Sequence, residues 1–222
     1  MGIFKTIVDG MTWLLNYLYS FTVSVGIPSY ALAIILLTVL IKLVLYPLTQ
    51  KQMKSMIGMQ QIQPKIKAIQ DKWKGKDPKK MQEEIMLLYK EHNVNPMAGC
   101  LPLLIQMPIL IALYRSLYAF PYENPAHATF FWLANLTDKD PLYILPVLAG
   151  VTTYIQSKMT TTGNDPTQKM MLYTMPVFIG WISATVPAGL ALYWVVFNVA
   201  SSVQQYFINK QTKVVKGEDG GK

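Results

Sequence analysis

Long apolar runs alternate with short polar stretches along most of this 222-residue chain. A helix crosses the hydrocarbon core of a bilayer with about 20 residues, each rising about 1.5 Å. Five runs come close to or exceed that length, at residues 29–48, 99–118, 141–158, 170–187 and 188–208. The pattern predicts an all-α integral membrane protein with five transmembrane helices at these positions.

Two segments outside these runs show the amphipathic spacing of surface helices. Residues 1–22 place apolar side chains at helical intervals but include Asp9 and Asn16, which favours a helix lying in the membrane interface. Residues 50–93 carry two successive apolar stripes, Ile62, Ile66, Ile69 and Trp73, then Met81, Ile85 and Leu88. The second segment is predicted to be a helical hairpin.

The turn of this hairpin has its own sequence signals. Gly75 ends the first helix, Asp77 is the predicted N-cap of the second, and Pro78 occupies its first helical position. Residues 119–140 are predicted to form a loop outside the membrane. The basic segment 209–222 is predicted to be a disordered tail.

Composition agrees with a membrane protein and narrows the chemistry. Hydrophobic residues make up 52% of the chain and charged residues 14%, against roughly 25% charged in soluble domains. The single Cys100 excludes an internal disulfide, and two histidines argue against a His-rich metal site. No cofactor is expected.

The lysines are distributed unevenly between the two sides of the predicted bundle. Sixteen lie in the hairpin segment, in the loop near 158–169 or in the tail, whereas only Lys5 and Lys139 lie on the other side. Loops rich in lysine stay in the cytoplasm. The N-terminus is therefore predicted to be outside and the C-terminus in the cytoplasm.

Lys42 is a charged residue inside the first apolar run. Such a position costs about 2.5–3.5 kcal/mol on insertion scales, so the charge usually has a role. Two interpretations are open: the side chain only extends to the nearer interface, or it attracts an acidic guest. No aspartate or glutamate lies in any of the five runs, so Lys42 has no counter-ion there.

Uncharged polar side chains and one tryptophan accompany Lys42 in the predicted spans. They are Thr38, Gln106, Thr152, Gln156, Trp194, Asn198, either Ser201 or Ser202, and Gln205. One interpretation is hydrogen bonding between helices, worth about 0.6 kcal/mol per pair. The other is a shared polar groove open to the cytoplasm, because most of them lie in the cytoplasmic half of their spans.

Four motifs resemble the YidC family of membrane protein insertases. The most specific is NPMAGCLPLLIQMPILIALY at residues 95–114. PLTQKQ at 47–52, YIQSKM at 154–159 and LYW at 192–194 match in place and order. The resemblance extends over about residues 10–210 and is to the compact form of the family, without a large extracytoplasmic domain.

The resemblance implies a five-span core in the bacterial cell membrane, with a hydrophilic groove open to the cytoplasm. The family usually has arginine at the position of Lys42, so the charge is kept but the planar, bidentate guanidinium is not. Groove positions of the family match Gln156 and Trp194. The function implied is insertion of newly made membrane proteins, without enzymatic chemistry.

The expected partners follow from charge and from the resemblance. Lys42 would attract nascent membrane proteins with acidic outer tails. The lysines of the hairpin and of the tail would recruit the nascent chain, the ribosome, the Sec translocon and anionic lipids. The other interpretation is that they only determine the topology. The candidates in the hairpin are Lys65, Lys67, Lys72, Lys74, Lys79 and Lys80.

Other functional classes fit the sequence less well. A solute transporter predicts an intramembrane acid or two matching halves, and an intramembrane protease predicts a Ser–His or paired-Asp arrangement within the spans. The sequence shows none of these. An assembly factor without insertase activity stays open.

Overall fold

The structure, a computed structural model, describes residues 2–94, 101–118, 120, 122–160 and 166–219. These residues form a helical protein with no strand among them, which confirms the predicted all-helical class. In chain order the helices are α1 (Gly2–Ser24), α2 (Tyr30–Val44), α3 (Tyr46–Trp73), α4 (Pro78–Glu91), α5 (Leu101–Tyr118), the 3₁₀ helix η2 (Pro125–Ala128), α6 (Ile144–Thr160), α7 (Pro166–Ser183) and α8 (Ala188–Asp219).

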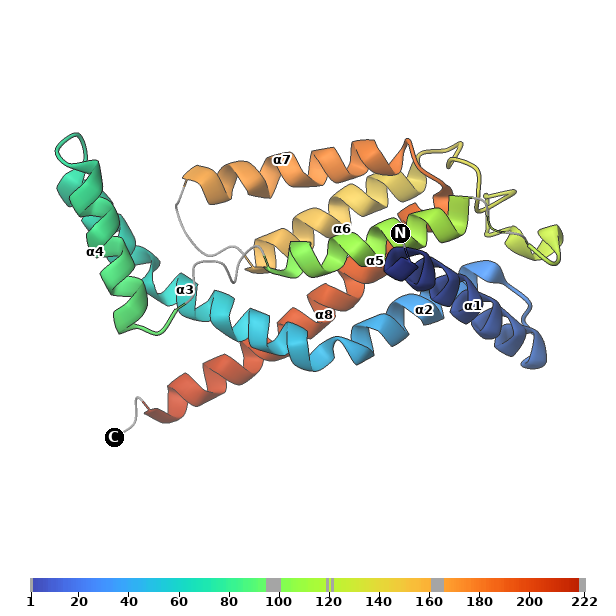
Figure 1. Cartoon of the computed structure of the whole chain (residues 1–222), viewed down its shortest axis with the longest axis horizontal. Helices are drawn as coiled ribbons and strands as arrows, with labels where there is room; N and C mark the ends of the chain where they lie inside the picture. Colours follow the sequence, from blue (N-terminus) through green and yellow to red (C-terminus); the bar gives the residue numbers. More distant parts are fainter. Residues whose placement is uncertain (1, 95–100, 119, 121, 161–165, 220–222) are drawn as a thin grey trace.

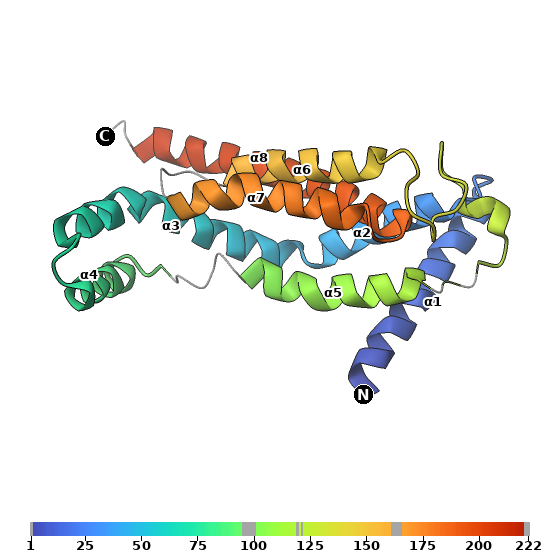
Figure 2. The same ribbon diagram turned by 90° about the horizontal axis from the view of Figure 1, so that it is seen from above.

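Helix α8 runs through the middle of the bundle (Figure 1). Helices α2, α5 and α6 pack on it, α7 packs mainly on α6, and α1 packs on α2 and α5. The α3–α4 hairpin and the C-terminal end of α8 extend from one end of the bundle, while η2 lies at the other end (Figures 1 and 2). The two most lysine-rich segments are therefore at the same end.

The first predicted span is bent. Helix α2 ends at Val44, and α3 begins at Tyr46 at an angle of 62° to it. Pro47 lies in the first turn of α3, where its missing N–H costs no hydrogen bond, and it disfavours helical geometry in the residue before it.

Taken alone, none of the described helices combines the length and apolar composition expected of a membrane crossing. The bent pair formed by α2 and the Tyr46–Met59 part of α3 meets both criteria together. The number of five crossings stays a prediction.

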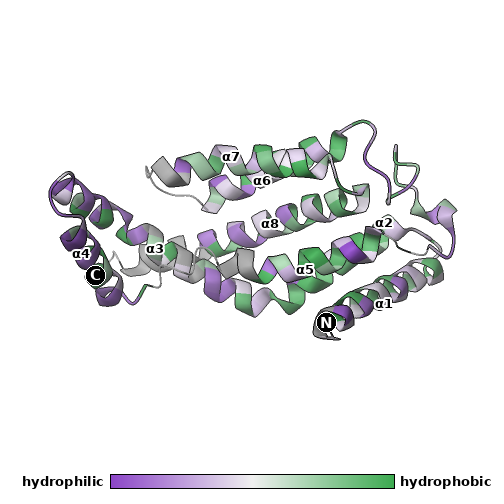
Figure 3. Ribbon diagram, turned by 45° about the horizontal axis from the view of Figure 1, so that its top comes forward, coloured by the Kyte–Doolittle hydropathy of each residue, from purple (hydrophilic) through white to green (hydrophobic). Residues whose placement is uncertain are grey.

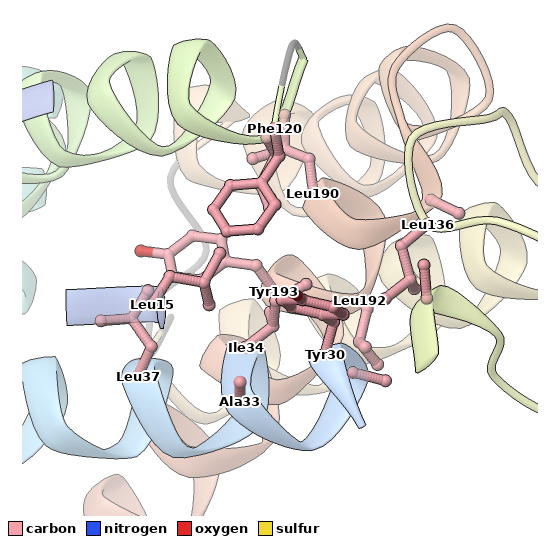
Figure 4. Close-up of a cluster of buried hydrophobic side chains, with 14 of the residues drawn as sticks. Leu15, Tyr30, Ala33, Ile34, Leu37, Phe120, Leu136, Leu190, Leu192 and Tyr193 are labelled. Carbon is pink, nitrogen blue, oxygen red and sulfur yellow. The ribbon is translucent and has the colours of Figure 1, made fainter. Parts of the chain in front are cut away.

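A core of buried apolar side chains joins α1, α2, α8 and the outer loop (Figure 4). Leu15, Ile34 and Tyr193 are completely buried in it. Gly189 allows α8 to approach closely, since a Cβ there would lie 3.1 Å from Cδ1 of Ile34. Small residues at such contacts let helices associate in a membrane, where apolar burial alone does not drive them together.

Glycines also set the contact between α6 and α7. A Cβ on Gly150 would lie 3.1 Å from the carbonyl oxygen of Pro176, and one on Gly180 would lie 3.3 Å from that of Pro146. The two backbones therefore pack directly on each other, and α7 is held to the bundle largely through α6.

The carboxylate of Asp140 anchors the outer loop to the start of α6. The residue is 3% exposed, and its Oδ1 accepts hydrogen bonds from Trp132 Nε1 at 2.9 Å and the Leu142 N–H at 3.0 Å. Oδ2 accepts from the Leu145 N–H at 2.7 Å. The Ala188 N–H donates to the carbonyl oxygen of Asp138, so the same loop is also fixed to α8.

The hairpin forms as its local signals predict. Ile62 and Ile66 of α3 pack against Leu88 of α4. Asp77 Oδ1 accepts from the N–H groups of Lys79 at 3.0 Å and Lys80 at 3.2 Å, which confirms its role as N-cap. Figure 3 shows that the hairpin is mainly hydrophilic and the bundle mainly hydrophobic.

Helix α8 extends to Asp219 and so includes most of the segment predicted to be disordered. The backbone of residues 209–216 contains neither proline nor glycine, and Gly217 is the first glycine after Gly189. The helix therefore meets no residue that would end it before that point.

Candidate functional site around Lys42

The Lys42 ammonium group lies against α8. Its Nζ donates a hydrogen bond of 2.5 Å to Ser201 Oγ and lies 3.7 Å from the centre of the Phe197 ring. Ser201 in turn donates to the carbonyl oxygen of Phe197, one turn earlier. A hydroxyl dipole and a ring face thus stabilise the cation without neutralising it.

Lys42 has no acidic partner in the structure as described. The ion pair found there joins Lys72 and Glu84, in the hairpin. The Lys42 side chain is partly buried, and its helix is apolar on both sides of it. A cation in such surroundings interacts with an incoming carboxylate more strongly than it would in water.

Two of the predicted polar residues use their hydroxyl groups within their own helix. Thr38 is completely buried and donates to the carbonyl oxygen of Ile34 at 2.7 Å. Ser202 donates to the carbonyl oxygen of Asn198 at 2.9 Å. Both hydroxyls can still accept a hydrogen bond, but neither has an unpaired donor.

Other members of the set connect neighbouring helices. Asn198 on α8 donates to Thr153 at 2.8 Å and to Thr152 at 3.3 Å, both on α6. Gln106 on α5 donates to the phenolic oxygen of Tyr193 on α8. For these contacts, hydrogen bonding between helices explains the residue type fully.

Gln156 and Trp194 occupy different surroundings. Gln156 is half-buried and lies near the C-terminal end of α6. That end of the helix lies toward the hairpin (Figure 1). Trp194 is half-buried on α8 and packs against the apolar core. The structure therefore places the predicted site residues on α2, α5, α6 and α8. Among the described residues, Lys42 donates a hydrogen bond to Ser201 and lies over the ring of Phe197.

Three glutamine side chains toward the hairpin end carry buried amide atoms without a hydrogen-bond partner. The atoms are Gln52 Nε2 on α3, and Gln204 Nε2 and Gln205 Oε1 on α8. An unpaired buried polar group costs about 1–3 kcal/mol, so such groups are uncommon and call for an explanation.

Open apolar hollows occur on another face. One of about 580 Å³ lies along α6 and α7, between Tyr143 and Ala184, and a second lies beside Trp181 of α7. Neither is lined by Lys42. The hydrophilic groove implied by the resemblance stays a prediction.

The six lysines proposed for recruitment are all exposed on the hairpin. Three of them also interact within it. Lys65 Nζ lies 2.9 Å from His92 Nε2, Lys72 pairs with Glu84 at 2.8 Å, and the Lys72 and Lys80 ammonium groups lie over the Trp73 ring. Exposed pairs of this kind contribute little stability, so the charges stay accessible to a partner.

The Lys72–Glu84 pair predicts a pH dependence in the hairpin. The hydrogen bond from Lys72 holds the pKa of the Glu84 carboxyl below its ordinary value of 4.5. A carboxyl group whose pKa is lower in the folded state stabilises the fold at pH values above its pKa in the unfolded state. This contribution is lost as the pH falls through the pKa of the folded state. We expect Lys72→Met to return the Glu84 pKa toward 4.5, measured by NMR titration of the side-chain carboxyl. An unchanged Glu84 pKa in that variant would show that the pair is absent in solution.

Some contacts were not predicted from the sequence. Phe197, Thr153 and Gln52 were not among the candidate residues, although Gln52 lies in one of the matching motifs. Phe197 could have been found from helical spacing, because it lies four residues before Ser201, on the same face of α8. Thr153 follows Thr152 directly, and spacing alone does not decide which of the two faces Asn198.

Known proteins resemble this chain in sequence and in fold. The sequence model of the family described as 60Kd inner membrane protein matches residues 21–216. The membrane protein insertase YidC of Caldanaerobacter subterraneus subsp. tengcongensis is 44% identical over 190 residues, which cover 86% of this chain and 90% of the relative. The YidC of Geotalea daltonii is 42% identical over 210 residues, 94% of this chain but 38% of the relative.

A solved structure is similar as well. It is described as an active YidC insertase with the first transmembrane domain resolved, and it matches with a TM-score of 0.74 and 30% sequence identity over 93% of this chain and 47% of that one. The chain spans less than half the length of this protein and of the Geotalea relative. The matched length and identity are sufficient to conclude that the chain belongs to the 60Kd inner membrane protein family, the family of the YidC membrane protein insertases.

Proposed function

We propose that this chain inserts newly made proteins into the bacterial cell membrane. The names of its relatives support the general activity. The observation that carries the proposed mechanism is the Lys42 ammonium group, which is partly buried and held by Ser201 and Phe197 without a carboxylate partner in the described structure. A cation held in this way can attract an acidic segment without first breaking an ion pair.

In the proposed mechanism, the polar outer tail of the substrate enters a groove from the cytoplasm. Lys42 attracts acidic residues of that tail, and the attraction is strengthened where water is scarce. Gln156 and Trp194 would line the path of the substrate, and its apolar segment would leave sideways along α6 and α8 into lipid. The protein binds and positions its substrate and makes or breaks no covalent bond.

The proposed orientation places the hairpin in the cytoplasm. The hairpin and the C-terminal end of α8 extend from the same end of the bundle, which supports the topology predicted from the lysines (Figure 1). There the exposed lysines would contact the ribosome, anionic lipid headgroups and, for some substrates, the Sec translocon.

Site-specific photocrosslinking tests the proposed path. A photoreactive amino acid at position 156 or 194 should crosslink a nascent, single-span substrate. Val177, which is 73% exposed on α7, is the matched control on a face outside the path. The proposal predicts crosslinks from 156 and 194 that are several times stronger than from 177. Equal yields at all three positions would contradict a defined path, and they would favour an assembly factor that contacts proteins already in lipid.

A further inference from the structure

An open apolar hollow runs along the contact between α6 and α7, on a face of the bundle that the proposed substrate path does not use. It has a volume of about 580 Å³. Gly150 and Gly180, where the two backbones meet, line it together with aliphatic and aromatic side chains. Val177 and Trp181, which also line it, are 73% and 66% exposed. The hollow is therefore open to the surroundings of the protein.

The length of the hollow matches the depth of one leaflet of a bilayer. On α6 its lining runs from Tyr143 to Tyr154, which is about 16 Å at about 1.5 Å per residue. The hydrocarbon core of a bilayer is about 30 Å thick, so one leaflet occupies about half of that. In a family of inner membrane proteins, an open apolar surface of this length is suited to an acyl chain.

Two lysines follow the hollow at the end that lies toward the hairpin (Figure 1). Tyr154 and Tyr173 stack at this end, with their ring centres 6.1 Å apart. Lys158 follows Tyr154 by four residues on α6, and Lys169 precedes Tyr173 by four residues on α7. Residues four apart lie on the same face of a helix. Both lysines, which are exposed, therefore continue the two faces that line the hollow.

No acidic partner of Lys158 or Lys169 is seen among the residues that the structure describes, where an ion pair joins Lys72 and Glu84 in the hairpin. The residues that line the hollow itself are all uncharged. An apolar hollow with two cations at one end is complementary to an amphiphile that has an anionic head and an apolar tail. Basic sites between membrane helices bind anionic lipid headgroups in this way.

We propose that the hollow binds an acyl chain of an anionic phospholipid and that Lys158 and Lys169 hold the phosphate of its headgroup. A zwitterionic phospholipid has the same chains but a headgroup without net charge, so the site prefers the anionic lipid. A membrane helix would fit the apolar walls as well, but the two lysines favour the phosphate. This inference rests on the membrane location of the family and not on the insertase function.

Photocrosslinking to lipid tests the assignment. The full-length chain with a diazirine amino acid at position 177 is reconstituted in vesicles of phosphatidylcholine and a minority of phosphatidylglycerol, both with the same acyl chains. Crosslinked lipids are identified by mass spectrometry, and the share of phosphatidylglycerol among them is divided by its share in the vesicles. Ile111, which is 40% exposed on α5, is the matched control position outside the hollow.

The ratio is expected to be about fivefold at position 177 and close to one at position 111, because two cations attract the anionic headgroup. Lys158→Gln combined with Lys169→Gln should bring the ratio at 177 close to one. Lys139→Gln removes an exposed lysine of the outer loop and should leave the ratio unchanged. The yield at position 111 in the double variant checks that it is reconstituted like the wild type.

A further variant tests the hollow without changing the charges. Val151→Trp fills part of the space between α6 and α7 and keeps both lysines. It should lower the total yield of lipid crosslinks at position 177 severalfold. An unchanged yield would show that the acyl chain lies elsewhere.

Three other results would overturn the proposal. A ratio close to one at position 177 in the wild type, or the same raised ratio at 111, would show that no selective site exists there. A raised ratio that persists in the double variant would show that the two lysines do not hold the headgroup. Crosslinks from 177 mainly to a second copy of the chain would show that a helix, rather than a lipid, occupies the hollow.

Discussion

Replacing Lys42 by glutamate is expected to slow the insertion of substrates with acidic outer tails by at least about tenfold. The substitution turns an attraction into a repulsion, and two unit charges about 4 Å apart interact by about 4 kcal/mol in a medium of intermediate dielectric. A change of about 1.4 kcal/mol in the barrier is already tenfold in rate. The measurement is the rate at which the outer tail becomes protected from protease in vesicles.

Two further variants separate charge from structure. Lys42→Arg keeps the charge and should insert at close to the wild-type rate, whereas Lys42→Gln should be intermediate for acidic tails. Ser201 can donate a hydrogen bond to glutamate as well as accept one from lysine, so Lys42→Glu has a partner in the fold. A substrate with a neutral tail should be affected little. Equal insertion of the acidic substrate by the lysine, arginine and glutamate forms would show that the charge has no role.

Replacing Asp140 by alanine is expected to reduce the free energy of unfolding by about 3 kcal/mol. The substitution removes a carboxylate that accepts from Trp132, Leu142 and Leu145 and leaves these three donors without it. Hydrogen bonds to a charged group are worth about 1.5–3 kcal/mol each. Water at the end of the bundle will accept hydrogen bonds from some of the freed donors, so the net loss of stability is smaller than the sum of the three. The measurement is denaturant-induced unfolding in detergent micelles.

Asparagine at position 140 provides the matched comparison. Its one amide oxygen can still accept from Trp132 and Leu142, whereas its NH₂ group would face the Leu145 N–H. We therefore expect a smaller loss of unfolding free energy than in the alanine variant. If the alanine and asparagine variants both unfold like the wild type, the carboxylate does not anchor the loop.

The features that could be predicted from the sequence are those that depend on neighbouring residues. Helical spacing of Ile62, Ile66 and Leu88 indicated the hairpin, and the Asp77–Pro78 pair indicated where its second helix begins. The bend at Leu45 has a local signal too, because Pro47 follows it closely. That signal is weak, since proline at the start of a helix and proline just after a helix look the same in a single sequence.

The contacts of Lys42 could not be predicted in the same way. Lys42 and Ser201 are 159 residues apart, and their contact depends on how α2 crosses α8. Helical spacing identified the polar face of α8 but left Ser201 and Ser202 as alternatives. The structure places Ser201 at the lysine, while Ser202 bonds to its own helix. The unpaired amide of Gln52 depends in addition on how α3 packs on its neighbours, which the sequence does not reveal.

The role assigned to the whole chain can be tested in vesicles that contain no other protein. A small single-span substrate with an acidic outer tail is added during its synthesis, and the fraction of tails protected from external protease is measured. The account predicts protection well above that of empty vesicles, and it predicts that Lys42→Glu removes most of it. Protection no greater than in empty vesicles would contradict the claim that this chain inserts proteins by itself.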